Sequence, residues 1–592
     1  MASRYDELKL NVKKYFCFAQ AIKYYSNLLM QVEESKKFTA YFICLDNYAE
    51  RLIAYTTFTY ADLQVKNSLI LPKSDANRIY LRGCLESCFI INILLKNYDL
   101  SSKFLSNIKA DIKKINYAYK DSSKNRKEIY SEYYTEDLEN IKYERRYSWL
   151  PRYKKKKAAN ISDLVNYMSI EDEATRAYFE MYIRSLDSYS HPSFYIPSMF
   201  HSPKSNSNFK EIFLLYDEGG IIHECNQMII NSLNTFLKSI NMEHSTDFLN
   251  LMNNSYEINT TPITSMRYVN DHILNQSPQY SKEDVCRFLW NRYSINDFFL
   301  SHVKQYPQYI GNITLGMSLL IDFLKSKNDN TNYKLVNTIM LLEDALLRYD
   351  EFLKAYTTDY ITSFYVQSRY LIEFIVNLNI LLNEDEERSY VYFIHQDIKS
   401  YQYKQNIYNF FKTQNIDNPK VEKDILRIEE KHQNDLKYIH EYYLNKFNHD
   451  IDERSISRLN GWAIHLNGLE NEEVINLPAL LTYSIEDLIK DVQDMFKSYG
   501  LMNIADFVQG YYEESCAYSH VTPYAFFNNL KIYRSNALLR EQYIVINMLI
   551  IQLYNKILET FNFSEDDPDI RRIDNLLIQS LLNLIVSISI KK

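Results

Sequence analysis

Arg184, Ser188 and His191 stand in the segment "YIRSLDSYSHPSF", at spacings that suit one face of a helix. Residues four and seven positions apart lie above one another on an α-helix. A guanidinium, a hydroxyl and an imidazole in one row are suited to binding a phosphate and transferring a proton. Because Pro192 follows His191 directly, we expect the helix to end there, where its dipole favours an imidazolium.

A second Tyr-Ser-His sequence occurs late in the chain, in "EESCAYSHVTP", and ends at His520. Pro523 follows three residues later, so His520 is also expected near a helix C-terminus. Glu513 takes the position that Arg184 has in the first segment. The two histidines are therefore candidates for the same proton-transfer chemistry, with unequal neighbours.

Two arginine–glutamate pairs precede these segments. Arg82 and Glu86 lie in "NRIYLRGCLESCFIINILLKN", and Arg369 and Glu373 lie in "QSRYLIEFIVNLNILLNED". Each pair is spaced i, i+4 and continues as an apolar stripe, which predicts a buried ion pair on a helix. Burial of two charges costs several kcal/mol per ion before pairing, by order of magnitude. A buried structural network, a network that supports a reactive site, and an exposed surface pair all remain open.

These features recur in the same order in both halves of the chain. The order is "AYTT", Arg-x-x-x-Glu, "NILL", a tryptophan (Trp149 and Trp462) and Tyr-Ser-His. This order predicts two diverged copies, residues 1–255 and 286–592, joined by a linker over 256–285. The chain has only 9 Gly and 12 Pro in 592 residues, which favours long helices. We therefore expect an all-α fold of two tandem helical bundles related by a pseudo-two-fold.

The chain has a net charge of −8, so nucleic acid would need a local basic patch. The segment "KYERRYSWLPRYKKKK" (142–157) has eight Lys or Arg residues, one Glu and four aromatic residues. Basic side chains attract phosphates, and aromatic rings stack on unpaired bases. A solvated basic loop and a protein-docking surface are the alternatives. The candidate RNA-binding residues are Arg145, Arg146, Trp149, Arg152, Lys154, Lys155, Lys156 and Lys157.

Several other classes of site and location have no sequence pattern behind them. The seven cysteines are mostly isolated, which is typical of reduced thiols in the cytoplasm. The N-terminus lacks the apolar core of a secretory signal, and the most apolar segment (543–558) is too short for a membrane span. We therefore expect no membrane contact. Nucleotide-binding glycine motifs and metal-ligand spacings are absent from the sequence, so we also expect no cofactor and no metal.

Arg184 followed by His191 resembles the R-x(4–6)-H motif of the HEPN superfamily. The Arg-x-x-x-Glu helices and the later tryptophan look similar to HEPN-like uncharacterised bacterial proteins of that group. This resemblance implies a metal-independent endoribonuclease that leaves a 2′,3′-cyclic phosphate, in a toxin–antitoxin or antiviral defence role. RNA (including tRNA), an antitoxin or defence-system protein and a second copy of the chain are the implied partners. Family sites form where two units meet, so His191 and His520 would face each other, with Arg184 as the phosphate-binding residue. Ser188, Glu513 and the two arginine–glutamate pairs would support them.

The alternative comes from a different class of protein. In it the chain is a catalytically inactive helical scaffold or sensor, whose arginines, glutamates and histidines form a structural network and which binds a protein partner or a small ligand. This alternative accounts directly for the missing arginine beside His520.

Overall fold

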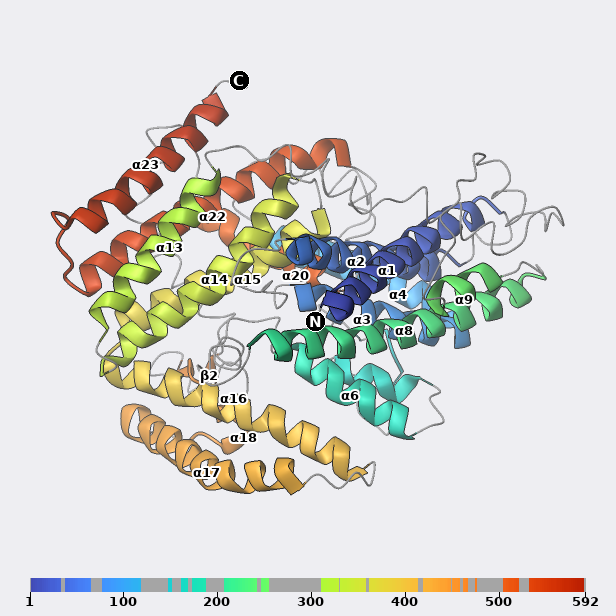
Figure 1. Ribbon diagram of the computed structural model, residues 1–592, viewed down its shortest axis with the longest axis horizontal. Helices are drawn as coiled ribbons and strands as arrows, with labels where there is room; N and C mark the ends of the chain where they lie inside the picture. The colour runs from blue at the N-terminus through green and yellow to red at the C-terminus, as the bar shows by residue number, and fades with distance from the viewer. Residues whose placement is uncertain are drawn as a thin grey trace.

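The computed structural model consists almost entirely of helices (Figure 1). It describes residues 2–32, 38–64, 77–118, 147, 149–151, 161–168, 173–187, 207–241, 246–254, 310–328, 331–357, 361–413, 419–448, 450–457, 461–466, 474–475, 504–520 and 532–589. Residues 2–254 of this set are the first half below, and residues 310–589 are the second half. The predicted linker, 256–285, lies outside the described residues.

The first half is built of long helices and one 3₁₀ helix. Its elements are α1 (Ala2–Leu29), α2 (Thr39–Gln64), α3 (Arg78–Lys96), α4 (Asp99–Ala118), η4 (Ile161–Tyr167), α6 (Glu173–Asp187), α8 (Ser207–Ser239) and α9 (Asp247–Asn254).

The second half adds a helical hairpin and a minimal pair of strands. Its elements are α13 (Ile310–Lys327), α14 (Tyr333–Thr357), α15 (Ile361–Asn383), α16 (Glu386–Thr413), α17 (Pro419–Phe447), α18 (Glu453–Ile456), β1 (His465–Leu466), β2 (Val474–Ile475), α20 (Ile504–Ser519), α22 (Ile532–Thr560) and α23 (Pro568–Ser589). Strands β1 and β2 pair antiparallel over two residues each. The predicted all-α class is confirmed for the described residues.

Three consecutive helices form the centre of each half. In the first half α2 packs against α1 and α3, and α8 covers α3. In the second half α14 packs against α13 and α15, and α22 covers α15. Helices α3 and α15 are buried along nearly their whole length, and most of their buried residues are apolar.

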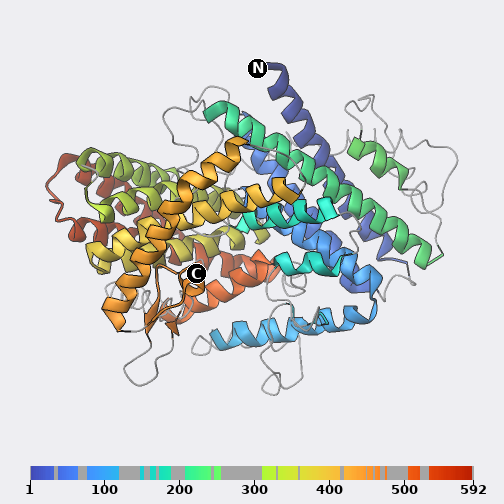
Figure 2. The same ribbon diagram turned by 90° about the horizontal axis from the view of Figure 1, so that it is seen from below.

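The halves meet through helices that cross from one to the other. Helix α20 packs on α4, α6 packs on α16, and α15 contacts α2. Figure 1 shows α15 and α20 reaching the centre of the molecule, beside α2 and α3. Figure 2, from below, shows α16 running alongside the first-half helices. Residues of both halves therefore share one apolar core.

Asparagine ends three of the helices. Asn241, Asn448 and Asn562 follow α8, α17 and α22 and have φ values of 56°, 50° and 53°. The left-handed conformation after a helix favours glycine and, next, asparagine. A chain poor in glycine thus uses asparagine at these turns. Among the described helices, none combines the length and the apolar character that crossing a bilayer requires.

Candidate active site

Helices α3 and α15 bring both arginine–glutamate pairs to one buried centre. Arg82 and Glu86 are one turn apart on α3, with Arg82 Nη1 4.0 Å from Glu86 Oε2. Arg369 and Glu373 repeat this on α15, with Arg369 Nε donating to Glu373 Oε1 at 3.1 Å. All four side chains are buried, so the surface-pair alternative is wrong. We call these four residues, with Tyr512 and His520, the polar centre.

His520 joins the two pairs. Its Nδ1 lies 3.5 Å from Glu86 Oε2 of the first half, and its Nε2 lies 3.5 Å from Arg369 Nη1 of the second half. A guanidinium can only donate hydrogen bonds, so Nε2 is the acceptor. This assigns the ring proton of a neutral imidazole to Nδ1, facing the carboxylate. The imidazole thus lies between a carboxylate of the first half and a guanidinium of the second, 3.5 Å from each.

Two tyrosines donate hydrogen bonds to the carboxylates. Tyr147 donates to Glu86 Oε1 at 2.7 Å, and Tyr512 donates to Glu373 Oε1 at 3.1 Å. Burial raises the pKa of Tyr512 well above its ordinary value, and the nearby Cys516 and Glu373 add to this. Tyr512 therefore remains a protonated donor across the physiological pH range.

Arg369 stays charged in this centre. Burial acts to lower the pKa of its guanidinium, but the Glu373 carboxylate, with Cys516 and Tyr512, outweighs that effect and raises the pKa above its ordinary value. The two arginines and two glutamates have no net formal charge together. Paired in this way, they can be buried without an isolated ion.

The three residues of the second-half Tyr-Ser-His sequence make different contacts. Helix α20 ends at Ser519, which leaves His520 at the helix C-terminus. The ring of Tyr518 stacks on Tyr365 of α15, with centroids 4.2 Å apart. Ser519 Oγ donates to the Ser515 carbonyl of its own helix at 2.8 Å. The histidine of the three points its ring nitrogens into the polar centre.

Arg51 of α2 holds this helix end from the other half. Its Nη2 donates to the carbonyls of Tyr518 at 2.5 Å and His520 at 3.2 Å, which are among the unpaired acceptors of a helix C-terminus. The Arg51 side chain is completely buried, and burial lowers its pKa even though Glu86 acts to raise it. Sequence reasoning missed Arg51. The one available signal was Gly83 in the middle of α3, where a Cβ would overlap the Arg51 side chain.

The other predicted site residues are placed only in part. Arg184 lies on α6, but its side chain is outside the described set, as are Ser188 and His191 altogether. Glu513 lies on α20 with a half-buried side chain. The predicted approach of His191 to His520 therefore stays a prediction.

Two of the four aromatic residues of the basic segment, Tyr147 and Trp149, belong to the core. Trp149 is 4% exposed and packs edge-to-face on Phe104 of α4, with centroids 5.3 Å apart. Tyr147 is also buried, and its hydroxyl donates a hydrogen bond to Glu86. The prediction that an RNA base stacks on Trp149 is therefore wrong, because the ring is buried and already packs on a protein side chain. The remaining predicted RNA-binding residues lie outside the described residues: Arg145, Arg146, Arg152, Lys154, Lys155, Lys156 and Lys157.

Searches of protein-family models, of curated protein sequences and of solved structures each find no match to this chain.

Proposed function

We propose that this chain is a metal-independent endoribonuclease of the HEPN type, with its reacting centre between the two halves. The observation that carries the proposal is the position of His520, which contacts Glu86 of the first half and Arg369 of the second. A composite site needs groups from both units at one point. The polar centre has this property.

The packing between the halves supports descent from two copies. Helix α20 of the second half packs on α4 of the first, and α6 of the first half packs on α16 of the second. Helices α6 and α20 each carry one of the two Tyr-Ser-His segments at or just beyond the C-terminal end. This reciprocity is what a pseudo-two-fold between tandem bundles produces.

Matching hydrogen bonds inside the halves give further support. Tyr48 of α2 donates to Asn226 Oδ1 of α8 at 2.6 Å, and Tyr349 of α14 donates to Asn547 Oδ1 of α22. Each bond joins the second helix of a half to the helix that covers its third. Between the halves Gln367 Nε2 donates to the Tyr80 hydroxyl at 3.0 Å, two residues before the arginine on each side. Corresponding positions that touch each other are expected on a pseudo-two-fold axis.

The proposed chemistry follows from the groups of the polar centre. In the proposed reaction Arg369 turns from His520 Nε2 to the phosphate, and the freed lone pair of Nε2 takes the proton of an RNA 2′-hydroxyl. The 2′-oxygen then forms a bond to the adjacent phosphorus. The bond from phosphorus to the 5′-oxygen breaks, that oxygen takes up the proton that His520 removed, and a 2′,3′-cyclic phosphate remains. The Arg369 guanidinium stabilises the charge on the phosphate, and Glu86 orients the imidazole. Arg184 and His191 enter the proposal through the family resemblance, as a second phosphate-binding and proton-transferring pair.

Cleavage of total RNA and tRNA in EDTA tests the proposal. We expect wild-type protein to leave 2′,3′-cyclic phosphate ends, and His520→Ala, His191→Ala and Arg184→Ala to lose cleavage. His440→Ala is the matched control, because His440 is an exposed histidine paired with Asp450. Undiminished cleavage by folded His520→Ala would exclude the polar centre as the reacting site.

A catalytically inactive scaffold or sensor is the second candidate, and the depth of the polar centre favours it. His520 is 5% exposed and Glu86 0%, which suits a network that holds the halves together. In that case wild-type protein leaves RNA intact, and His520→Ala lowers the free energy of unfolding by about 1–3 kcal/mol, as expected when buried polar groups lose a neighbour.

A further inference from the structure

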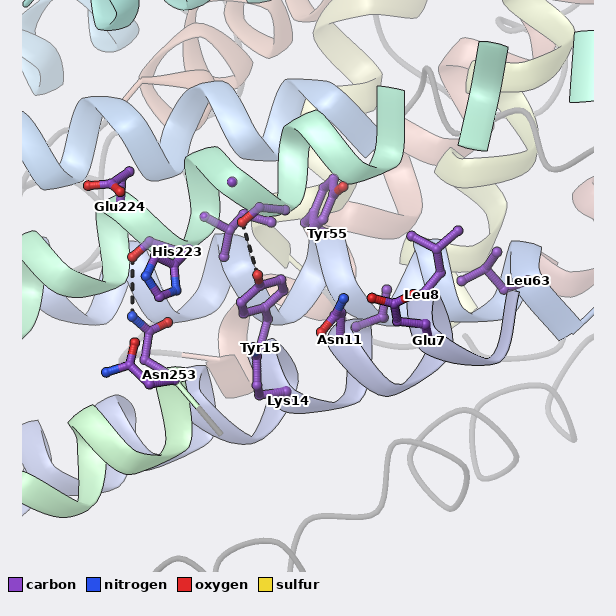
Figure 3. Close-up of a pocket in the computed structure, with 15 residues that line it drawn as sticks. Glu7, Leu8, Asn11, Lys14, Tyr15, Tyr55, Leu63, His223, Glu224 and Asn253 are labelled. Atoms are coloured by element: carbon purple, nitrogen blue, oxygen red, sulfur yellow. Dashed lines mark hydrogen bonds between the residues drawn. The ribbon is translucent and has the colours of Figure 1, made fainter. Parts of the chain in front are cut away.

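Two features of the described surface lie outside the polar centre. One is a pocket of about 310 Å³ between α1, α2, α8 and α9, where Figure 3 shows Tyr15 of α1 bonded across to α8. That bond runs from the Tyr15 hydroxyl to the Gly219 carbonyl at 2.9 Å. The lining mixes Lys14, Glu7 and Glu224 with apolar side chains, so it fits no single class of ligand. The other feature is the outer face of α17, which has a more definite pattern.

Helix α17 forms an edge of the molecule, where it packs on α16 and the short α18 (Figure 1). One of its faces is buried along Leu436, Ile439 and Tyr443. The opposite face carries Leu426, which is 63% exposed, and Leu444, which is 40% exposed. These two leucines are about five helical turns apart, so they point in the same direction. The outer face of α17 thus has an exposed apolar side chain near each end.

The residues between the two leucines keep the spacing of a coiled coil. Alternating steps of four and three residues define an outer stripe. Its members are Leu426, Glu430, Gln433, Lys437, His440 and Leu444. Five of them are exposed, and the side chain of His440 is 39% exposed. The same alternating steps separate the a and d positions of a heptad, which line the contact between two paired helices.

The outer stripe is complementary to itself when a second copy of α17 runs antiparallel to the first. With Leu426 opposite Leu444 of the second copy, the same register places Glu430 opposite His440. The two central members of the stripe, an amide and an ammonium, then also lie opposite each other. The contact is apolar at both ends and polar with matching groups in the middle.

Charged residues beside the outer stripe fit the same register. Arg427 and Glu441 are exposed and each follow a d-type position, and in an antiparallel pair these flanking positions face each other. Arg427 of each copy therefore meets Glu441 of the other, whose carboxylate lies 3.7 Å from Lys437 of its own stripe. A parallel pair would instead place Glu430 against Glu430 and Lys437 against Lys437. Like charges in contact disfavour that arrangement.

We propose that α17 is the contact of a homodimer, in which two copies of the chain pair through the outer stripe in antiparallel orientation about a two-fold axis. Such a contact uses the same patch on both copies and closes at two. Polar side chains in the stripe fix the orientation and reduce the stability of the pair, so the dimer dissociates in the micromolar range. This assignment does not depend on the proposed nuclease activity.

Sedimentation equilibrium of the full chain tests the proposal. We expect the mass to rise from 70.7 kDa toward twice that value as the protein concentration increases. Arg427→Glu and Glu441→Arg each bring like charges together at the flanking contact, and each should raise the dissociation constant about tenfold or more. An equimolar mixture of these two variants should dimerise again, because the two carboxylates of one chain then meet the two guanidiniums of the other. Arg572→Glu, at an exposed position of α23, is the matched control and should dimerise as wild type does.

Three results would overturn the assignment. The first is wild-type protein that stays monomeric up to about 100 μM. The second is a dimer that neither Arg427→Glu nor Glu441→Arg weakens, since another surface would then hold the two copies. The third is a mixture of the two variants that stays monomeric, which would exclude the antiparallel register. Circular dichroism of each variant checks that it is folded as wild type.

Discussion

Replacing Gly83 by alanine tests whether Arg51 positions the helix end that carries His520. A methyl group at this point of α3 would overlap the Arg51 side chain, whose Nη2 donates to the carbonyls of Tyr518 and His520. Alanine gains about 1 kcal/mol of helix propensity. Displacing a buried charged donor loses about 1.5–3 kcal/mol for each hydrogen bond. With two such bonds at stake, we expect Gly83→Ala to lower the free energy of unfolding by about 2–5 kcal/mol.

Urea denaturation followed by circular dichroism measures this change. Gly219→Ala is the matched control, because its Cβ meets the nearest atom at 3.7 Å and should add about 0.5–1 kcal/mol of stability. In an Arg51→Ala background the overlap no longer exists, so Gly83→Ala should become stabilising there. A Gly83→Ala protein as stable as wild type, or a destabilisation that persists without Arg51, would refute the reasoning.

Three further predictions concern the rest of the fold. Asn226→Ala and Asn547→Ala each remove the acceptor of a buried tyrosine hydroxyl and should each lower the free energy of unfolding by about 1–3 kcal/mol in urea denaturation. Trp149→Ala leaves a cavity beside α4 and should cost about 3–5 kcal/mol by the same measurement, whereas an exposed ring would cost far less. Burial lowers the pKa of Lys399 from 10.5 to about 8, so between these values only the unfolded chain binds the proton and wild-type stability rises with pH. Lys399→Met should remove that rise, as seen in urea midpoints at about pH 8 and pH 9.5.

The sequence alone determined the local part of this structure. The scarcity of glycine and proline and the apolar periodicity predict long helices, because helix formation depends on neighbours within one or two turns. The i, i+4 spacing likewise placed Arg82 beside Glu86 and Arg369 beside Glu373 on apolar helix faces. Pro523 marked His520 as a residue near a helix end. Each of these follows from contacts a few residues apart, which a single sequence displays.

Only the tertiary structure decided which of these local features meet. His520 lies against Glu86, which is hundreds of residues away in the sequence, and no local pattern encodes that pairing. Trp149 sits among basic residues in the sequence, but its ring is buried because α4 supplies Phe104 as a partner. Arg51 gave no signal of its own, since its acceptors are backbone carbonyls, which every residue has. Burial and long-range partners depend on how whole helices pack, and that is why the polar centre could be anticipated in its parts but not assembled from the sequence.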